Sequence, residues 1–594
     1  MILIITFVVA TVASLGLGAI VRRVAPAIGA VMPPRIDRWH EHATPTMGGV
    51  AIASATALAL MVTLVQFDFR AESAVLLPVL LAAGAMFFVG VLDDRLQLSP
   101  LAKLVSSLIV GAFVVFALSG AGPGGLPLGD TILAIVWFAG ICHALNLLDN
   151  MDGLAAGVGL IAAAFMAVVF GGVLSMALVG LLVALSGALL GFFYWNRSRA
   201  RLFMGDCGSL FIGAVLAGVS LVPIFQAGEV LSRAGLMAGL ILVVPLFDTS
   251  FVLVLRRLAG RPATRGGTDH VSHRFVSLGF SDRSAVRILY LVGLGGGAIA
   301  LALGLFEPDV MLPIVALFAV ILGLLGIYLA RVPAYDAEDF LALEKSSFAP
   351  FLKDLTFRWH AGQVILDLVL ISACYYFAYW LRFPAVQFAH FLPIFGASLP
   401  AVLGLKLASL YVSGLYQRSW QTFGLRDIAA VLRGVGLGTL LSVLLAAYLY
   451  RFEGFSRVVF ALDALLLTVA VLATRAFFPA MDMVASARNK RSRRMLVYGA
   501  GAFGRLLVRE MRANPDWQMN PVAFIDDDPA KLRQWIEGVP VRGALEVLDS
   551  VLRAHQVNEV IVSSLSVSDD VEQQIRSVCA DLQLPVRRLK MEIS

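Results

Sequence analysis

The chain has 594 residues, of which 59% are hydrophobic and only 14% are charged, and its mean hydropathy is +0.86. Soluble domains carry about 25% charged residues, so this composition excludes an ordinary soluble enzyme and predicts a polytopic α-helical membrane protein. Basic loops that face anionic lipid explain the net charge of +6 and give no reason to expect nucleic acid as a partner. Four scattered cysteines without a CxxC pair predict neither a disulfide framework nor a zinc site.

Apolar runs long enough to cross a bilayer recur along the chain. About fifteen runs reach the roughly 17–25 residues that one span needs. They begin near residues 2, 48, 75, 102, 130, 154, 174, 209, 232, 286, 311, 361, 391, 430 and 456. Lys and Arg concentrate in alternate loops, at 22–47, 93–103, 196–206, 256–287, 331–358, 417–433 and 488–494. This bias predicts that the basic loops face the cytoplasm and that the amino terminus lies outside.

Changes of composition divide the chain into four segments. We expect a polytopic domain at 1–331, a polar connector at 332–358, a four-helix membrane domain at 359–487, and a cytoplasmic Rossmann-like α/β domain at 488–594. In the last segment, strands are expected at 495–498, 522–526 and 560–563, and helices through 511, around 529–537 and from about 567 to 582.

A glycine loop follows the first of these strands. Gly499, Gly501 and Gly504 come directly after it, and Asp526 ends the second strand. This spacing indicates a site for a nucleotide or nucleotide-sugar, and the alternative is a degenerate fold that keeps its turn for packing. No Tyr-x-x-x-Lys follows the loop, so dehydratase or epimerase chemistry has no visible catalytic pair.

Four polar clusters interrupt the apolar chain where spans reach the predicted cytoplasmic side. They are Val91–Arg95, Asn146–Gly153, Met204–Ser209 and Asp269–Arg274. A carboxylate near a bilayer core costs about 2.5–3.5 kcal/mol or more. Carboxylates that converge on one face with two histidines therefore indicate a metal-assisted site for a phosphorylated substrate.

Asp93 and Asp94 end the third span. Neighbouring residues on a helix diverge by about 100°, so one carboxylate can face a metal while the other faces substrate or a basic partner. A solvated helix end paired with Arg95 is the structural alternative. Lys103 is expected to contact a phosphate, unless it only extends its ammonium to the membrane surface.

Asn146, Asp149 and Asp152 recur every three residues, and we expect them to converge on one ligand from one side of a helix, unless they form a helix C-cap. Asp206 lies between glycines that let phosphate and metal approach the backbone, so it is expected to bind Mg²⁺, although an N-cap role is compatible. Asp248, in an apolar span, is either a substrate contact or a structural hydrogen-bond acceptor.

His270 and His273 lie in an arginine-rich loop together with Arg274. Arginine and protonated histidine bind phosphate oxygens strongly, so this loop is expected to grip a diphosphate. A surplus of carboxylates without thiolates favours Mg²⁺ or Mn²⁺ over zinc.

These clusters, together with the segment Ala43–Gly49, resemble the polyprenyl-phosphate N-acetylhexosamine-1-phosphate transferase family over residues 1–331. The resemblance implies transfer of HexNAc-1-phosphate from a UDP-sugar such as UDP-GlcNAc to undecaprenyl phosphate, with release of UMP, to initiate a cell-surface glycan such as an O-antigen or capsule. It implies that Asp93 or Asp94 acts on the lipid phosphate, with Asp93 favoured as the base. It further implies metal binding by Asp206 with Asp94, nucleotide contacts from Asn146, Asp149 and Asp152, and phosphate contacts from His270, His273 and Arg274.

Residues 359–594 resemble the front end of membrane-bound nucleotide-sugar dehydratases and of polysaccharide-initiating phosphoglycosyltransferases, without their catalytic domain. This resemblance implies a regulatory, dimerising or scaffolding module, a homodimer, and docking of later glycan-assembly enzymes. Two other interpretations remain open. One is a catalytically inactive scaffold or nucleotide-sugar sensor, and the other is a transporter of lipid-linked sugars, which predicts polar residues near span midplanes.

Overall fold

The computed structural model describes residues 1–32, 44–65, 69–119, 126–258, 267, 269–330, 332, 360–383, 385–416, 423–451, 455–488, 493–513, 517, 519–563 and 567–589. Two compact units are present, one formed by Met1–Ser277 with Ser281–Phe478 and the other formed mainly by Pro479–Ser594. The connector predicted at 332–358 lies outside the described residues, except for residue 332.

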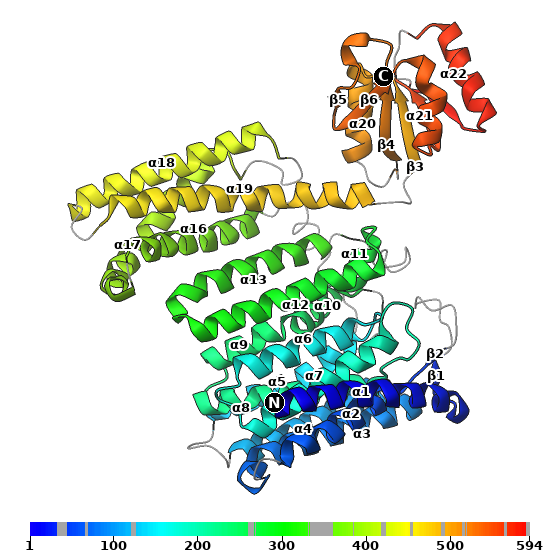
Figure 1. Cartoon of the computed structure of the whole chain (residues 1–594). Coiled ribbons are helices and arrows are strands. Elements are labelled where there is room, and N and C mark those ends of the chain that lie inside the picture. The colour runs from blue at the N-terminus through cyan, green and yellow to red at the C-terminus, as the bar shows by residue number, and fades with distance from the viewer. Residues whose placement is uncertain are drawn as a thin grey trace. The chain divides into compact units, whose positions relative to one another are not determined.

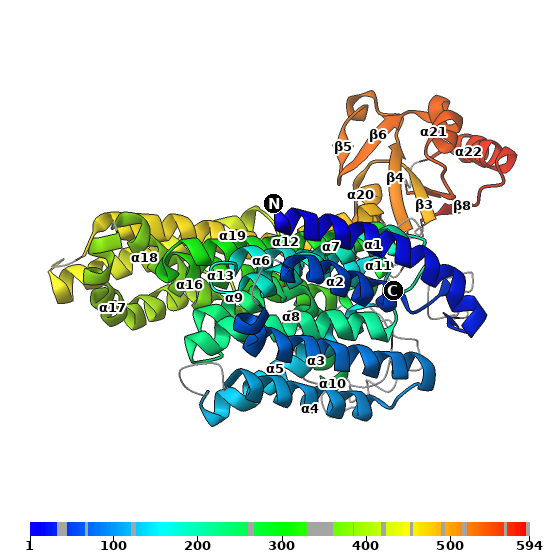
Figure 2. The same cartoon turned by 60° about the horizontal axis from the view of Figure 1, so that its bottom comes forward.

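Helices make up nearly all of residues 1–330. They are α1 (Ile2–Val24), α2 (Gly48–Leu64), α3 (Phe69–Leu96), α4 (Pro100–Ser119), α5 (Leu128–Leu148), α6 (Leu154–Val169), α7 (Met176–Asn196), α8 (Asp206–Ala227), α9 (Arg233–Ile241), α10 (Val243–Leu258), α11 (Val271–Ser277), α12 (Asp282–Leu305) and α13 (Pro308–Ala330). The long helices run side by side in Figures 1 and 2. A short antiparallel pair, β1 (Val31–Met32) and β2 (Thr44–Pro45), precedes α2.

Four further helices form the second membrane segment, namely α16 (His360–Arg382), α17 (Ala385–Val412), α18 (Leu425–Tyr450) and α19 (Arg457–Arg488). Among the described residues, 12 helices are long and apolar enough to cross a membrane, and α9 with α10 forms one more candidate span that is bent by 80°. The shorter apolar helices α2 and α6 have 17 and 16 residues. Each predicted apolar run is therefore helical, and the prediction of a polytopic helical membrane protein is confirmed, although 12 or 13 spans are found in the described residues where about fifteen were expected.

Helix α8 forms the centre of the first segment. Every residue from Cys207 to Phe225 is buried, as expected for a helix that is apolar on all sides. Glycines bring its first turn against α2 and α3, because a Cβ at Gly49 would lie 2.2 Å from the nitrogen of Gly208, and one at Gly90 would lie 2.4 Å from the Cα of Cys207. These close approaches fix the helix end that carries Asp206.

Two buried ion pairs join helices of the second membrane segment. Lys406 of α17 pairs with Asp463 of α19, and both side chains are fully buried. Arg475 of α19 pairs with Asp367 of α16 at 2.8 Å. Since an isolated charge in such a setting is expensive, each pair ties its two helices together.

The remaining unit is an α/β domain built on one six-stranded sheet. Its strands are β3 (Arg493–Tyr498), β4 (Met519–Ile525), β5 (Trp535–Ile536), β6 (Val539–Gly543), β7 (Glu559–Val562) and β8 (Val586–Arg588), in the order β5-β6-β4-β3-β7-β8. All neighbouring strands are parallel except β5 and β6. From β6 to β7 this is the 3-2-1-4 order of doubly wound dinucleotide-binding sheets.

Helices cover both faces of this sheet. Met495 and Val497 of β3 pack in the cluster that includes α20 (Ala502–Ala513), whereas Leu496 and Tyr498 pack in the cluster that includes α21 (Leu548–Ala554) and α22 (Asp569–Asp581). Side chains alternate between the faces because a strand has a period of two residues. The predicted α/β architecture of this domain is confirmed.

The helix predicted around 529–537 is wrong. A single 3-10 turn, Pro529–Lys531, is followed by the short strand β5. Glu537 and Gly538 then take positive φ values of 49° and 67°, as a two-residue hairpin turn requires. The chain therefore reverses into β6 where a helix would have continued.

Candidate active site

Three helix ends meet around the ammonium group of Lys103. Its Nζ donates to Asp93 Oδ2 at 2.6 Å and to Asp206 Oδ2 at 3.1 Å. Asp93 ends α3, Lys103 begins α4 and Asp206 begins α8. The Asp93 side chain is 7% exposed and that of Asp206 is 33% exposed, so Asp206 is the carboxylate that an incoming ligand reaches more easily.

Asp94 holds the start of α8. Its two oxygens accept the backbone amides of Asp206 at 2.9 Å and of Cys207 at 3.1 Å. Backbone amides at a helix start lack partners within the helix and favour a negative charge, so the Asp94 carboxylate satisfies both. Gly205 has a φ of 74°, and a Cβ there would lie 2.8 Å from Asp94 Oδ2. Asp94 thus fixes the position of Asp206.

The polar residues after α5 do not form one helical row. Asn146 is on the helix and donates to Ser209 Oγ at 3.0 Å, but α5 ends at Leu148 and Asp149 is its C-cap. Asp152 lies in the following turn, where its Oδ2 accepts the amide of Ala200 at 2.9 Å. The expectation of three residues on one side of a helix is therefore wrong, because the chain turns before Asp152.

A buried Asp–His pair forms a second cluster. Asp248 Oδ2 lies 2.7 Å from His270 Nδ1, and Asp248 Oδ1 accepts the amide of Val271 at 2.8 Å. The rings of His270 and His273 lie 6.4 Å apart, centroid to centroid. Both oxygens of Asp248 are used inside the protein, so Asp248 orients His270 and the start of α11.

Two arginines hold the loop that carries these histidines. Arg256 donates two hydrogen bonds of 2.7 Å to Asp269, and although burial acts to raise the pKa of Asp269, these bonds lower it below its ordinary value. Arg274 is 1% exposed and donates to the carbonyl oxygens of Asp269, Leu329 and Val332. Guanidinium donors of Arg274, which was predicted to contact phosphate, are thus already used in hydrogen bonds that position the loop.

The turn after α5 lies between the two clusters. Ser272 Oγ donates to Asn150 Oδ1 at 2.9 Å, and Asn150 Nδ2 donates to the carbonyl of Leu147 at 3.0 Å. Gly153 has a φ of 77° and begins α6, while Tyr290 of α12 donates to its carbonyl at 2.6 Å. Short polar residues thereby connect the histidine loop to the helix end that carries Asn146. The sequence assigned no role to Ser209, Ser272 or Tyr290, because their partners are distant in the chain.

The carboxylates fit a magnesium ion that takes other ligands from substrate and water. No group of three His, Cys, Asp or Glu side chains in the part of the chain that the structure describes is arranged to hold a metal by itself. Asp93 and Asp206 nevertheless direct one oxygen each toward the same cation, the Lys103 ammonium. Mg²⁺ in phosphoryl-transfer sites is commonly held by one or two carboxylates together with waters and substrate phosphates.

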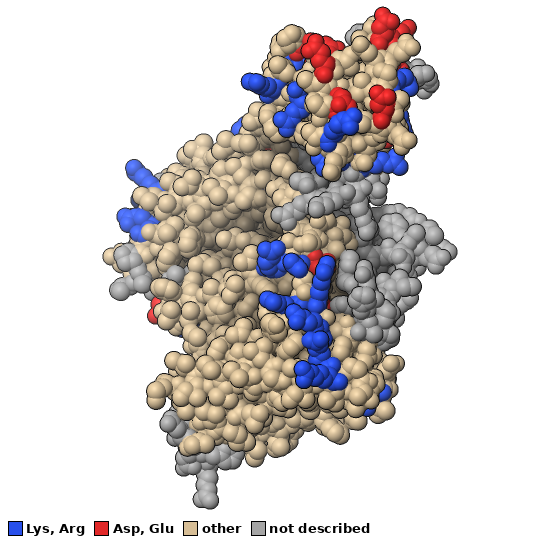
Figure 3. Space-filling model, turned by 45° about the vertical axis from the view of Figure 1, so that its right-hand side comes forward, with Lys and Arg blue, Asp and Glu red and all other residues tan. Residues whose placement is uncertain are grey.

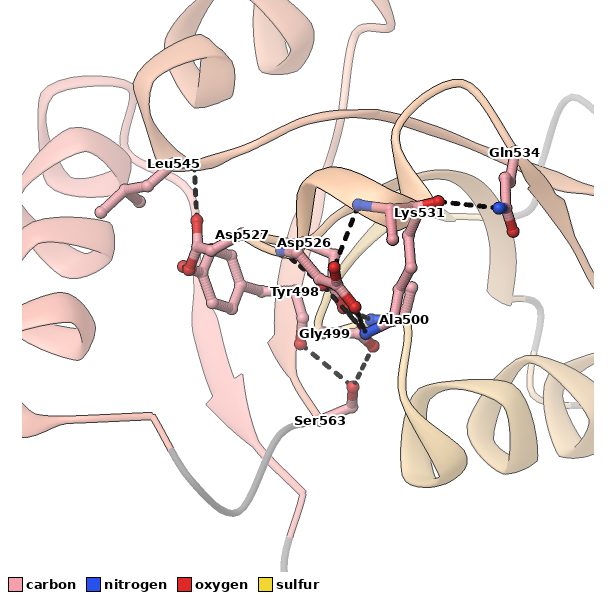
Figure 4. Close-up of polar contacts among 11 residues, drawn as sticks. Tyr498, Gly499, Ala500, Asp526, Asp527, Lys531, Gln534, Leu545 and Ser563 are labelled. Atoms are coloured by element: carbon pink, nitrogen blue, oxygen red, sulfur yellow. Dashed lines mark hydrogen bonds and ion pairs between the residues drawn. The ribbon is translucent and has the colours of Figure 1, made fainter.

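The α/β domain contains a separate pocket of about 620 Å³ beside the glycine loop. Figure 4 shows Asp526 between the backbone of Ala500 and the side chain of Lys531. Asp526 accepts the amides of Ala500 at 2.6 Å and Asp528 at 3.0 Å, and Lys531 Nζ lies 3.1 Å from each oxygen. Partial burial acts to raise the pKa of Asp526, but these donors outweigh it and hold the pKa below its ordinary value.

The three glycines of the loop have different surroundings. Gly499 has a φ of 99°, and a Cβ at Gly504 would lie 2.0 Å from the carbonyl oxygen of Gly499. Glycine is therefore required at both positions, at Gly499 by its positive φ and at Gly504 by the close backbone contact. A Cβ at Gly501 would meet nothing within 4 Å, although this residue lines the pocket. Backbone conformation and packing thus account for Gly499 and Gly504 but not for Gly501.

Comparison with known proteins identifies the first half of the chain. A family model described as glycosyl transferase family 4 matches residues 76–224, which include the Asp93–Lys103–Asp206 cluster. A probable undecaprenyl-phosphate N-acetylglucosaminyl 1-phosphate transferase of Bacillus subtilis is 32% identical over 303 residues, covering 49% of this chain and 82% of that protein. The chain belongs to glycosyl transferase family 4.

Other family members and a second match support the same division of the chain. A decaprenyl-phosphate N-acetylglucosaminephosphotransferase of Mycolicibacterium smegmatis is 33% identical over 46% of this chain and 74% of that protein. A phospho-N-acetylmuramoyl-pentapeptide-transferase of Lactobacillus gasseri is 29% identical over 46% of this chain and 89% of that protein. A model described as a CoA-binding domain matches residues 412–584, from the end of α17 to just beyond α22. The predicted fusion of a transferase-like segment with a different second half is confirmed.

Proposed function

We propose that the protein transfers HexNAc-1-phosphate from a UDP-sugar to a polyprenyl phosphate such as undecaprenyl phosphate. The observation that carries the proposal is the meeting of Asp93, Lys103 and Asp206 at three helix ends, inside the segment that matches glycosyl transferase family 4. The names of the relatives support polyprenyl phosphate as acceptor and N-acetylglucosamine phosphate as the transferred group.

In the proposed reaction, an oxygen of the lipid phosphate forms a bond to the β-phosphorus of the UDP-sugar. The bond from this phosphorus to the bridging oxygen breaks, UMP leaves, and the product is a polyprenyl-diphosphate-sugar. A Mg²⁺ or Mn²⁺ ion held by Asp206 would neutralise the diphosphate, so that an anionic nucleophile can approach it.

Each side chain of the first cluster has a role that follows from its contacts. Asp93 accepts the proton of a protonated lipid phosphate or orients that phosphate, and it is the more buried of the two carboxylates beside Lys103. Asp94, bonded to the amides of Asp206 and Cys207, keeps Asp206 in place and is a positioning residue. Asp206 would hold a divalent cation, and the Lys103 ammonium, which bonds to Asp93 and Asp206 in this structure, would supply a donor for a phosphate oxygen.

The second cluster is suited to the nucleotide diphosphate. His270, oriented by Asp248, and the neighbouring His273 supply donors for phosphate oxygens. Asn146, Asp149 and Asp152 lie around the turn between the clusters and are proposed to shape the nucleotide site. Arg274 and Arg256 act through the loop that they hold.

UMP release by the full-length protein tests this proposal. Detergent-purified protein is supplied with undecaprenyl phosphate, Mg²⁺ and a panel of UDP-HexNAc donors, with Asp206→Asn as the matched control. UMP that depends on lipid and metal, and falls at least about 100-fold in the variant, would support the reaction, because deleting one electrostatic contact in a phosphoryl-transfer site costs about that much. No UMP from any donor would favour the alternative of an inactive scaffold.

The reaction is proposed to occur at the cytoplasmic face of a bacterial inner membrane and to initiate a cell-surface glycan. The concentration of arginines in alternate loops supports this orientation. We also propose that the second half of the chain mediates homodimer formation and docks later glycan-assembly enzymes. Labelling of single cysteines introduced at two exposed positions tests the orientation, because the span α4 separates Arg95, near the end of α3, from Leu128, at the start of α5. Only the Leu128→Cys variant should react from outside intact cells.

A second proposed activity is binding of a nucleotide or nucleotide-sugar by the α/β domain. The open side of Gly501 in the 620 Å³ pocket supports it, as does the name of the CoA-binding model. In dinucleotide-binding folds, an acidic residue about 20 residues after the glycine loop accepts a hydrogen bond from a ribose hydroxyl, and Asp526 would take this role here. Titration of full-length protein with NAD, UDP-GlcNAc and CoA tests the proposal. Saturable binding of any of the three that is lost in Gly501→Val supports it, whereas no binding, or binding that Gly501→Val leaves unchanged, would leave the loop a structural remnant.

A further inference from the structure

Five exposed arginines form a continuous cluster at one end of the first membrane segment. Arg22 and Arg201 lie over the ring of Trp195, at 5.6 and 6.0 Å from its centroid. Arg197 and Arg201 lie over Tyr194 at 5.3 and 5.4 Å. We call the set Arg22, Arg197, Arg201, Arg283 and Arg287 the arginine belt.

The belt joins three helices that are distant in the sequence. Arg22 lies in the last turn of α1, Arg197 and Arg201 directly follow α7, and Arg283 begins α12. Arg283 Nε donates to Ser198 Oγ at 2.9 Å, and Arg287 Nε donates to the carbonyl of Arg283 at 3.1 Å. Figure 3 shows a strip of Lys and Arg on a face where most surrounding residues are uncharged.

The positive charge of the belt is not balanced within the described part of the chain. None of the ion pairs found there involves a belt arginine. The nearest acids in sequence are Asp282, which is exposed beside Arg283, and Asp152, which is bonded to the amide of Ala200. Apart from the bonded Nε atoms of Arg283 and Arg287, the guanidinium donors of the belt are therefore available to a ligand as far as the described residues go.

The location of the belt identifies the ligand class. Helices α1, α7 and α12 are candidate membrane spans, and the belt lies where all three reach the same end. Tyrosine and tryptophan are enriched at the head-group level of membranes, and clustered Arg or Lys beside a span bind anionic lipid. Guanidinium groups that stack on aromatic rings keep their fork of donors free for phosphate oxygens.

The belt is also connected to the candidate active site. Residues 197–204 form the segment between α7 and the Gly205–Asp206 start of α8. Within it, Ala200 donates to Asp152 at 2.9 Å. Just before it, Asn196 at the end of α7 accepts the amide of Gly153 at 3.0 Å. A ligand that immobilises Arg197 and Arg201 therefore immobilises the backbone that leads into Asp206.

From these contacts we infer that the arginine belt binds the head groups of anionic phospholipids and that this binding activates the enzyme by ordering residues 197–204. The binding stands on the belt geometry alone, whereas the activation rests on the proposed transferase function. The occupant is a membrane phospholipid and not the nucleotide donor, because the belt lies at membrane-span ends and is built around interfacial aromatic residues.

The test uses full-length protein in nanodiscs of phosphatidylcholine with 0, 20 or 40% phosphatidylglycerol. Variant Arg197→Gln/Arg201→Gln is compared with the wild type and with Arg426→Gln/Arg433→Gln, which removes the same charge from exposed positions on α18. Thermal unfolding reports lipid binding without reference to activity, and UMP release reports activation. Each arginine near an anionic surface contributes about fivefold in affinity, so the affinity of the double variant for anionic lipid should fall about 25-fold.

We expect the unfolding temperature and the UMP release of the wild type to rise with phosphatidylglycerol. In Arg197→Gln/Arg201→Gln both increases should be lost while activity in pure phosphatidylcholine is unchanged, and the control should behave like the wild type. Equal lipid dependence in all three proteins would overturn the inference, as would a raised KM for the UDP-sugar with an unchanged lipid response. If the stability response is present but no protein releases UMP, the proposed reaction fails and the lipid site stands.

Discussion

Substitution of Gly90 by alanine should disable the candidate active site without unfolding the protein. Gly90 lies one turn before Asp94 on α3 and faces the first turn of α8. A Cβ there would lie 2.4 Å from the Cα of Cys207 and 2.5 Å from the carbonyl oxygen of Asp206. Both atoms belong to the backbone, so no side chain can rotate away to make room.

The size of the effect follows from the distances. Ordinary contact begins at 3.4 Å, so α3 and the start of α8 must separate by about 1 Å, a misplacement that can lower turnover by about 100-fold. That loss corresponds to about 2.7 kcal/mol of transition-state stabilisation. The separation also stretches the two hydrogen bonds from the amides of Asp206 and Cys207 to Asp94, which are 2.9 and 3.1 Å long.

Gly84→Ala is the matched control, because Gly84 lies on the same helix and a Cβ there would meet nothing within 4 Å. Alanine is favoured over glycine in a helix by about 1 kcal/mol, so this variant should keep full activity and unfold at an equal or higher temperature. The assay is UMP release together with thermal unfolding of both purified variants. Turnover of Gly90→Ala within about threefold of the wild type would refute the argument that close backbone contact fixes Asp206.

Three other predictions test different parts of the molecule. Asp94→Asn should lower turnover by about tenfold or more, since a neutral amide that donates as well as accepts cannot satisfy both amides of the α8 start; unchanged UMP release would contradict its positioning role. Lys406→Met should destabilise the second membrane segment by about 3–5 kcal/mol by leaving Asp463 buried and unpaired, and adding Asp463→Asn should restore much of the loss in thermal unfolding. Asp526→Asn should speed hydrogen exchange at the Ala500 amide. The folded-state pKa of Asp526 is lowered from 3.8. The stabilisation that its ionised carboxylate gives the folded state is therefore present above the pKa of the unfolded state, and it is lost as the pH falls through the pKa of the folded state. The difference in Ala500 exchange rate between variant and wild type should therefore persist from pH 8 to about 5 and shrink only below about 3.8. If this difference in exchange rate is already lost at pH 6, the assignment is contradicted.

The membrane architecture was predictable because its cause is local. A span needs a continuous apolar run of about the thickness of a bilayer, and this requirement is met or not met within one short stretch of sequence. Each predicted run is a helix in the structure, including the short α2 and α6. The strands β3, β4 and β7 were predictable for a similar reason, since fully buried parallel strands are short apolar runs. The structure of residues 529–537 was not predictable in this way. The positive φ values of Glu537 and Gly538 belong to a hairpin, and this hairpin depends on the pairing of β5 with β6.

The candidate site was predictable in its residues but not in its geometry. Charged and polar groups at span ends are costly, so Asp93, Lys103 and Asp206 stand out from the apolar sequence around them. Their grouping around one ammonium depends on α3, α4 and α8 meeting, over a separation of 103 residues between Lys103 and Asp206. Asp93 bonds to Lys103, whereas Asp94 bonds to the amides at the start of α8. This difference likewise depends on which of the two carboxylates faces α8.

Sequence alone determined that this protein is a multi-span membrane protein with an α/β domain, and it predicted which acids, histidines and glycines form the candidate sites. These properties follow from residue type and local spacing. Only the tertiary structure decided that Asp248 and Arg274 are turned toward the protein, that Gly90 is held against Cys207, and that arginines from α1, α7 and α12 form one surface. The physical reason is that each of these contacts joins residues from different helices, and helix packing is set by the fit of whole surfaces that no short stretch of sequence contains.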